Sequence, residues 1–207
     1  MLIRSQGNKI GTAFEDDLRA KGYGMVAGVD EVGRGPMAGP VVTCAVILPA
    51  GLIIDGIDDS KKLSPKKRES LAAVIKEKSV AYAYGIVDAK TIDRINILQA
   101  ALLAMKYAVE GLGVKPDAVL VDGNKLPDLS GCYMQCVVQG DSKSQIIAAA
   151  SILAKVKRDD IMDDIHKWFP QYGFDKHRGY GTVKHRAAVE QFGLCDEHRV
   201  SFRYRKG

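Results

Sequence analysis

Short apolar runs alternate along the chain with longer stretches in which apolar residues recur every three or four positions. Apolar runs of roughly four to eight residues bounded by glycine, proline or aspartate are typical of buried strands, and the longer spacing is typical of helices. The pattern predicts strands at Met25–Asp30, Val41–Leu48, Val80–Val87, Ala118–Val121 and Cys132–Val138. It predicts helices at Ser64–Lys78, Thr91–Leu112, Ser142–Phe169 and Lys184–Phe192.

The order of these elements predicts the fold class. Strands that follow each other closely usually pair as antiparallel neighbours, whereas strands joined through helices usually pair in parallel. The early strands are of the first kind and the later ones of the second, so we expect an α/β fold with a mixed five-stranded sheet flanked by helices. The last helix would form a small helical C-terminal appendage. Ligand sites in such sheets lie at the strand ends.

Composition argues against a membrane or secreted protein. The chain has 207 residues, 46% of them hydrophobic, which is typical of a globular domain. No apolar run reaches the roughly 18 to 20 residues that span a bilayer. Acidic residues at positions 15–17 stand where a signal peptide would be apolar. We therefore expect a cytoplasmic protein with reduced thiols at Cys44, Cys132, Cys136 and Cys195.

Positive charge gathers at the C-terminal end. The formal net charge is +5, and residues 176–207 contain eight Lys or Arg against three Asp or Glu, a balance of +5 that leaves the preceding residues neutral. Three of the four histidines, His177, His185 and His198, lie in the same segment. Such a segment fits a polyanionic partner, and it fits a basic surface in contact with solvent equally well.

Carboxylates stand at the ends of three predicted strands. Asp30 and Glu31 end the first strand, Asp122 directly follows the fourth, and Asp141 follows the fifth just before a helix. Neighbouring strand residues face opposite sides, so Asp30 and Glu31 share a site only where the strand ends or bulges. Taken alone, the Asp-Glu pair is more typical of a solvated turn. Asp141 is also a candidate helix cap, a role that Ser142 fills equally well.

Together, these four carboxylates indicate a metal site. Carboxylates at neighbouring strand ends repel each other unless a cation lies between them, and hard divalent cations such as Mg²⁺ or Mn²⁺ prefer oxygen ligands. A two-metal phosphodiester site requires such a set, because one ion activates water and the other stabilises the leaving oxygen. The candidate catalytic and metal-binding residues are therefore Asp30, Glu31, Asp122 and Asp141.

Three loops carry candidate substrate contacts. The loop at residues 33–35 is Gly-Arg-Gly, which lets a ligand approach the backbone, but it lacks the Gly-Lys-Ser/Thr ending of a nucleotide-binding switch. The loop at residues 59–64 holds two lysines and two serines, which suits phosphate contacts or a solvated entry to the next helix. Tyr180 lies among basic residues and glycines without apolar neighbours, which favours stacking on a base or sugar over a core position.

Taken together, these stretches resemble the type 2 ribonucleases H, and the bacterial ribonuclease HII branch in particular. The resemblance runs from about Val26 to Phe202. The matching segments are Gly28–Val42, Asp59–Ser64, Val119–Gly123, Gly140–Asp159, Lys176–Thr182 and His198–Phe202.

The resemblance implies an RNase H-like fold, with a catalytic domain at residues 1–175 and a basic substrate-binding loop and helical segment at residues 176–207 packed on it. It implies an endoribonuclease that uses Mn²⁺ or Mg²⁺. We expect a monomer, because no long apolar surface pattern demands a dimer. Its substrates would be RNA–DNA hybrids and duplex DNA with embedded ribonucleotides, which it would cut on the 5′ side of the ribonucleotide. The backbone of Gly33, Arg34 and Gly35 would read the 2′-hydroxyl, with Tyr180 sharing that role. Phosphate contacts are expected from the loop residues Ser60, Lys61, Lys62, Lys143, Lys176 and Arg178.

Some features set limits to the resemblance. Cys195-Asp196-Glu197 stand where relatives often have a proline, and residues 203–207 do not match the clamp-binding tail that some relatives carry. Asp159 lies about 27 Å along an unbroken helix from Asp141, so we expect it to form a structural ion pair. A non-catalytic hybrid-binding module is the alternative reading of the same basic loops.

Overall fold

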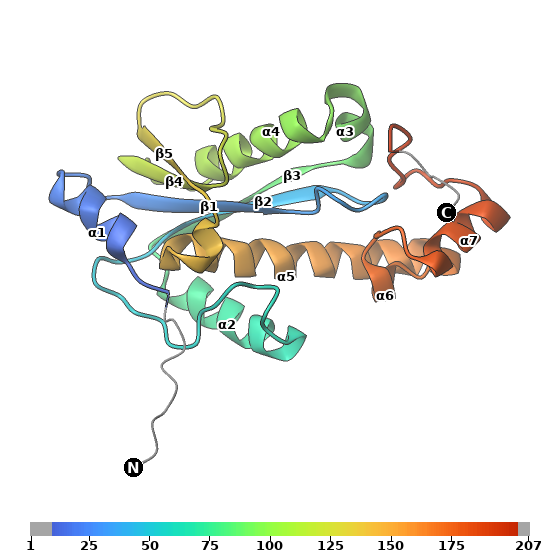
Figure 1. Ribbon diagram of the computed structural model, residues 1–207, viewed down its shortest axis with the longest axis horizontal. Coiled ribbons are helices and arrows are strands. Elements are labelled where there is room, and N and C mark those ends of the chain that lie inside the picture. Colours follow the sequence, from blue (N-terminus) through green and yellow to red (C-terminus); the bar gives the residue numbers. More distant parts are fainter. Residues whose placement is uncertain (1–9, 203–207) are drawn as a thin grey trace, which may run out of the picture.

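A single mixed sheet forms the centre of the molecule (Figure 1). The computed structural model describes residues 10–202. The strand order is β3-β2-β1-β4-β5, with antiparallel pairing of β1 with β2 and of β2 with β3, and parallel pairing of β1 with β4 and of β4 with β5. The predicted mixed five-stranded sheet is therefore confirmed. The strands are β1 (Val26–Val32), β2 (Val41–Ile47), β3 (Ala81–Val87), β4 (Ala118–Asp122) and β5 (Tyr133–Val137).

Helices cover both faces of the sheet, as predicted. Helices α2 (Pro65–Lys78) and α5 (Gln145–Trp168) lie on one face, and α4 (Ile97–Glu110) lies on the other (Figure 1). The apolar side chains between these layers form the core. The layers approach closely at Gly28, where a Cβ atom would lie 2.6 Å from the backbone of Ile146 in α5. A glycine at this position therefore sets the distance between β1 and α5.

The helix predicted at Thr91–Leu112 is wrong as a single element. It is divided into α3 (Ala89–Ile95) and α4 at Asn96, whose φ of 68° lies outside the helical region. The Asn96 side chain accepts hydrogen bonds from the backbone N–H groups of Leu98 and Gln99, so it begins the second helix. The amphipathic pattern continues on both sides of Asn96, and therefore the pattern does not indicate the break.

The sequence pattern also missed the N-terminal helix α1 (Ala13–Ala20). Its Glu15 side chain is buried and accepts hydrogen bonds from Ser144 Oγ at 2.8 Å and from the backbone N–H of Ile146 at 2.9 Å. These contacts attach α1 to the start of α5. Ser144, and not Asp141 or Ser142, caps α5, because its side chain accepts from the N–H of Ile147.

The C-terminal segment packs on the far end of α5 (Figure 1). It contains α6 (Phe174–His177) and α7 (Val183–Phe192), and its apolar cluster includes Met162 of α5 and Ala38 of the loop after β1. This cluster joins both of the predicted domains, and the boundary at residue 175 stays a prediction. All four cysteines are unpaired. The predicted lack of a clamp-binding tail concerns residues 203–207, which lie outside the described residues.

Across the described part of the chain, from residue 10 to residue 202, none of the helices has the length and apolar character needed to cross a membrane.

Candidate active site

Two of the four candidate acids, Asp30 and Asp122, lie where the parallel pairing of β1 with β4 ends, and the turn of a third, Asp141, is bonded to Asp122. The parallel pairing of β1 with β4 runs as far as Val29 and Val121, so the next residues, Asp30 and Asp122, are neighbours at the edge of this pair. Asp122 Oδ1 accepts a hydrogen bond of 2.6 Å from the backbone N–H of Gly140. That bond holds the short 3₁₀ turn at Gly140–Ser142, which carries Asp141.

Asp30 and Glu31 leave opposite sides of β1, because the strand continues through Val32 instead of ending at Asp30. Asp30 lies on the α5 side and accepts a hydrogen bond from Ser151. Glu31 accepts a 3.2 Å hydrogen bond from Arg34. Within residues 10–202, no three His, Cys, Asp or Glu side chains are gathered closely enough to share one ion as they stand.

Burial opposes ionisation of these acids. It raises the pKa of Asp30 well above its usual value, and the charges of Glu31 and Asp122 add to the effect. Burial likewise raises the pKa of Glu31, and it raises the pKa of Asp122, where the Asp141 charge contributes. A nearby cation favours the ionised form of such a group. Carboxylate oxygens are also the donors that hard divalent cations prefer.

Lys61 is the candidate phosphate contact whose side chain pairs directly with one of these acids. Its Nζ lies 3.5 Å from Asp141 Oδ2, and its side chain is 82% exposed. The charges of Asp141, Asp59 and Asp30 raise the pKa of Lys61, although burial alone would lower it. An exposed cation beside the acids is well placed to contact a phosphate.

The two loops expected to recognise the ribose, the one at residues 33–35 and the one that carries Tyr180, lie side by side. Gly33 has a φ of 97°, a conformation that favours glycine. A Cβ atom built on Gly35 would lie 3.5 Å from Cε1 of Tyr180, so the loop after β1 lies beside the tyrosine ring. Tyr180 is half exposed, which agrees with its predicted position outside the core. A 2.8 Å hydrogen bond from Met37 N–H to the carbonyl of Gly179 joins the two loops.

The remaining lysine candidates are exposed, but each has an internal partner. Lys62 pairs with Asp58 at 3.3 Å and Lys176 with Asp175 at 2.8 Å. The Lys143 ammonium donates a 2.6 Å hydrogen bond to the carbonyl of Val138. Their phosphate contacts stay predictions.

Ser60 differs from these lysines because its hydroxyl points inward. Ser60 is buried, and its Oγ lies 3.0 Å from Ser151 Oγ, the group that also hydrogen-bonds Asp30. The structure thus places the Ser60 side chain behind the acids and not at the surface where a phosphate would lie. Its expected phosphate contact is not favoured by this geometry.

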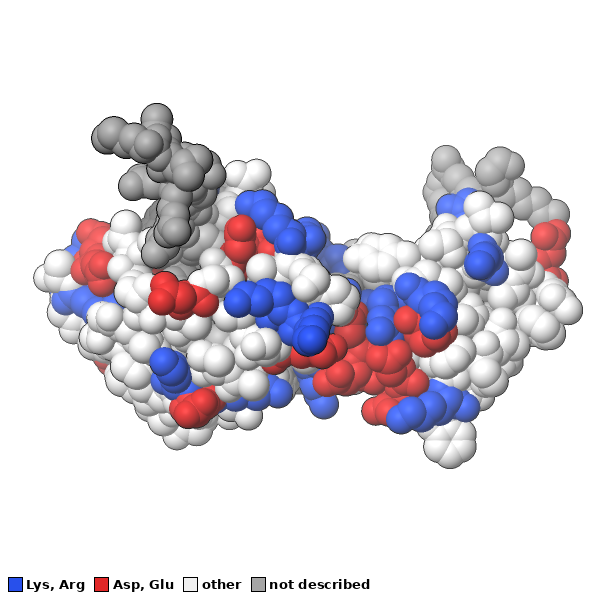
Figure 2. All heavy atoms as spheres, turned by 90° about the horizontal axis from the view of Figure 1, so that it is seen from below, with Lys and Arg blue, Asp and Glu red and all other residues white. Residues whose placement is uncertain are grey.

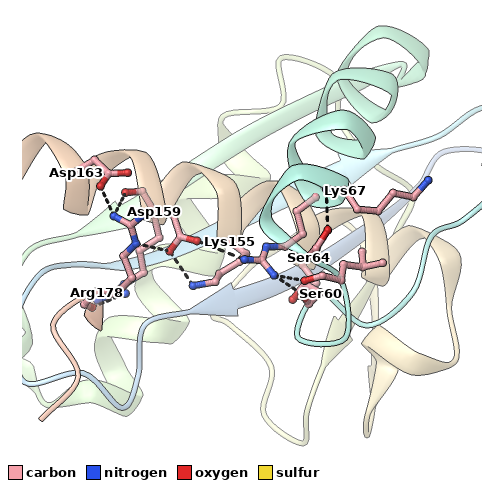
Figure 3. Close-up of polar contacts among 11 residues, drawn as sticks. Ser60, Ser64, Lys67, Lys155, Asp159, Asp163 and Arg178 are labelled. Carbon is pink, nitrogen blue, oxygen red and sulfur yellow. Dashed lines mark hydrogen bonds and ion pairs between the residues drawn. The ribbon is translucent and has the colours of Figure 1, made fainter. Parts of the chain in front are cut away.

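Arg178 is held by acids of α5 (Figure 3). Its guanidinium donates to Asp163, and its Nε lies 3.7 Å from Asp159. Asp159 also pairs with Lys155 at 2.7 Å and with Arg68 at 3.9 Å, so the expected structural ion pair of Asp159 is confirmed.

These side chains line a cavity of about 380 Å³ between α2, α5 and α6, on the face in which Figure 2 shows acidic and basic groups intermingled. Figure 2 also shows a hollow between the body of the molecule and the C-terminal segment that contains α6 and α7, here called the C-terminal lobe. The acids partly neutralise the basic character that the sequence predicts for this region.

Two of the C-terminal histidines do not add positive charge either. His185 and His198 are buried, and their Nε2 atoms lie 3.0 Å apart. Burial lowers the pKa of both, that of His198 to about 4. Both rings are therefore neutral near pH 7.

Sequence reasoning missed three side chains that support the site: Ser151, Arg158 and Arg199. All three lie within the recognised motifs, but nothing in their local pattern reveals their long-range contacts. Arg158 and Arg199 are fully buried and donate to carbonyl groups of the loop after β1. The sequence gives no signal for the burial of Arg158, because it follows Lys155 and Lys157 in a polar stretch whose side chains are only partly buried.

Comparison with known proteins agrees with the geometry. Residues 27–205 match the protein family described as Ribonuclease HII. The Ribonuclease HII of Chlamydia caviae is 51% identical over 192 residues, which cover 92% of this chain and 90% of that protein. That of Vibrio campbellii is 53% identical over 183 residues, covering 88% and 86%. The solved ribonuclease H2 of Pyrococcus horikoshii is 26% identical and matches with a TM-score of 0.73, covering 87% of this chain and 94% of the other.

Proposed function

The chain belongs to the ribonuclease HII family of RNA–DNA hybrid endoribonucleases, and on that premise we propose that it also cuts on the 5′ side of single ribonucleotides embedded in duplex DNA. The products would carry 5′-phosphate and 3′-hydroxyl ends. The observation that carries this proposal is that Asp30 and Asp122 lie side by side where the parallel pairing of β1 with β4 ends, while the Gly140 N–H holds the turn of Asp141 against Asp122.

The acids are proposed to hold two divalent cations, Mg²⁺ or Mn²⁺. Oxygen donors and raised pKa values support this assignment for Asp30, Glu31 and Asp122. Bound ions of this kind lower the pKa of water and neutralise charge on a phosphate. Asp141 would complete the set of metal ligands. Its partner Lys61 would leave Asp141 and contact a phosphate of the substrate instead. Glu31 would turn towards the other acids, exchanging its hydrogen bond with Arg34 for an ion.

The loop after β1 is proposed to select the ribonucleotide. Only RNA offers a 2′-hydroxyl, which both donates and accepts hydrogen bonds. Arg34 and Gly35 are exposed, so their backbone N–H groups would be offered to that hydroxyl, and the Tyr180 ring beside Gly35 would offer a stacking surface for the neighbouring sugar. The exposed side chains of Lys61, Lys62 and Lys143 would contact phosphates.

One cleavage assay tests the proposal. A duplex with one ribonucleotide in an otherwise DNA strand is incubated with the full chain and Mn²⁺, with Mg²⁺, or with EDTA, beside an all-DNA duplex of the same sequence. We expect one cut, 5′ of the ribonucleotide, that needs metal, disappears with EDTA and returns when Mn²⁺ is restored in excess. An intact ribonucleotide duplex under all conditions would reject the proposal and leave a binding module.

A further inference from the structure

Two buried arginines from distant parts of the chain hold the loop that follows β1. Arg158 lies in α5 and Arg199 lies in the C-terminal segment, and neither side chain is exposed to solvent. Removing a charge from water is costly unless its hydrogen bonds are satisfied. Burial lowers the pKa of Arg158 to about 10, so it still carries its charge near pH 7. Two buried guanidinium groups around one loop therefore carry a large desolvation cost, which the hydrogen bonds to the loop must offset.

Arg199 holds the beginning and the end of the loop together. Its Nη2 donates to the carbonyls of Gly33 at 2.6 Å and Gly39 at 2.7 Å, and its Nη1 donates to the carbonyl of Arg34 at 3.2 Å. The guanidinium also lies over the ring of Phe202, 5.0 Å from its centroid. A planar group with five donors can hold several carbonyls in one fixed arrangement.

Arg158 joins the same loop to the segment that carries Tyr180. Its Nε donates to the carbonyl of Pro40 at 3.0 Å, its Nη2 to Ala38 at 3.2 Å and its Nη1 to Arg178 at 3.0 Å. The contact is tight, because a Cβ atom on Gly33 would lie 2.4 Å from Arg158 Nε. Arg158 therefore fixes the position of one ribose-reading loop relative to the other.

These contacts also determine where the amide groups of the loop point. In a trans peptide the C=O group and the following N–H group point in opposite directions, and the described residues contain no cis peptide. Because Arg199 binds the carbonyls of Gly33 and Arg34, the N–H groups of Arg34 and Gly35 point away from it. Arg34 and Gly35 are exposed, and Tyr180 lies beside Gly35.

We propose that Arg158 and Arg199 are positioning residues for ribonucleotide specificity. They orient the amide groups of Arg34 and Gly35 and set their distance from the Tyr180 ring, so that a ribose with a 2′-hydroxyl is recognised. This inference rests on the proposed function. Without the two guanidinium groups the loop adopts several conformations, and binding of the ribonucleotide then carries the free-energy cost of selecting one of them.

The test compares two equilibrium dissociation constants for each variant. Binding of a duplex with one ribonucleotide and of an all-DNA duplex of the same sequence is measured by fluorescence anisotropy with Ca²⁺, and a gel confirms that the duplex stays intact. In Arg158→Lys and Arg199→Lys the charge remains, but lysine is a point donor that cannot hold three carbonyls in a plane. We expect the preference for the ribonucleotide to fall about tenfold, as for a loop that is competent about a tenth of the time, with DNA binding unchanged.

Arg68→Lys is the matched control. Arg68 also donates to two backbone carbonyls, those of Ser60 and Leu63, but it holds a different loop. We expect this variant to keep the wild-type preference, even where it weakens binding of both duplexes. A purely structural role of Arg158 and Arg199 would lower the melting temperature or weaken both duplexes equally, and it would leave the preference unchanged.

The outcomes separate the inference from the proposed function. A wild-type protein that binds both duplexes equally contradicts the proposed ribonucleotide recognition. A wild-type preference that survives in both lysine variants overturns the role of the arginines. Should both variants be unfolded at the assay temperature, Phe202→Leu decides the question, because it removes the ring that packs on Arg199 and keeps an apolar side chain beside the cluster that contains Ile92. A smaller loss of preference supports the inference, and an unchanged preference contradicts it.

Discussion

At the scale of single residues, Asp122 is the point at which the acids are joined. It lies next to Asp30 across the β1–β4 pair and holds the turn of Asp141 through Gly140. Asp122→Asn keeps the shape and the acceptor oxygen but removes the negative charge. We expect cleavage of a single-ribonucleotide duplex to fall by more than about a hundredfold. Substitution of a residue that only hydrogen-bonds to a metal ligand already lowers activity by up to about a hundredfold. Binding of the uncut duplex should change little.

The matched control is Asp117→Asn. Asp117 directly precedes β4, and its carboxylate accepts a 2.8 Å hydrogen bond from the backbone N–H of Met25, away from the acids. We expect initial rates with Mn²⁺ within about twofold of wild type, since the substitution is far from the reacting phosphate. Metal-dependent cleavage retained by Asp122→Asn would remove Asp122 from the proposed ligands.

The positions of the acids could be predicted because they depend on local pattern. A strand ends where apolar residues give way to glycine and aspartate, and parallel strands bring their ends together. The opposite orientations of Asp30 and Glu31 were not predicted, because the strand continues to Val32 by pairing with β2. The roles of Ser151 and the two buried arginines were not predicted, because their hydrogen-bond partners lie far away in the sequence.

At the scale of elements, Asn96 separates α3 from α4. Its φ of 68° and ψ of 163° are a conformation that costs non-glycine residues about 1–3 kcal/mol. Its side chain caps α4, and loss of such a cap costs about 1 kcal/mol. We expect Asn96→Ala to lower the free energy of unfolding by about 1–2 kcal/mol in urea titrations, because the cap is lost and the strain stays.

Asn96→Gly separates the two effects. Glycine adopts this conformation without strain and is a fair cap, so we expect it to be more stable than Asn96→Ala by about 1 kcal/mol or more. Equal stability of the two variants would contradict this account. The break was not predicted because the apolar positions keep their helical spacing on both sides of Asn96, and only backbone geometry reveals it.

At the scale of the whole molecule, the fold followed from the order of its elements, whereas the charge of the C-terminal lobe did not follow from its composition. Arg178 is paired with acids of α5, and His185 and His198 are neutral inside the lobe. Sequence counts treat each basic residue as exposed. Burial and ion pairing depend on packing, which the counts do not contain.

The buried histidines make stability depend on pH. His198 Nδ1 accepts from the backbone N–H of Cys195, so its Nε2 donates to His185 Nε2, and His185 Nδ1 donates to the carbonyl of Tyr180. Protonation of His185 would set two N–H groups against each other. Burial lowers the pKa of His198 to about 4 from its usual 6.5. Stability is therefore complete above about pH 6.5 and is lost as the pH falls towards 4, where the unfolded chain binds the extra proton.

This linkage predicts a loss of about 2 kcal/mol between pH 7.5 and pH 5 from His198 alone. Urea unfolding of wild type and of His198→Gln at both pH values measures it. Glutamine keeps a donor and an acceptor but cannot be protonated, so the variant should lose about 2 kcal/mol less than wild type over the same interval. The raised pKa values of Asp30, Glu31 and Asp122 act in the opposite direction in both proteins and cancel in the difference. Identical pH dependence in the two proteins would show that His198 is readily protonated in the folded chain, and the hydrogen-bond chain that joins it to Tyr180 would then have to be reassigned.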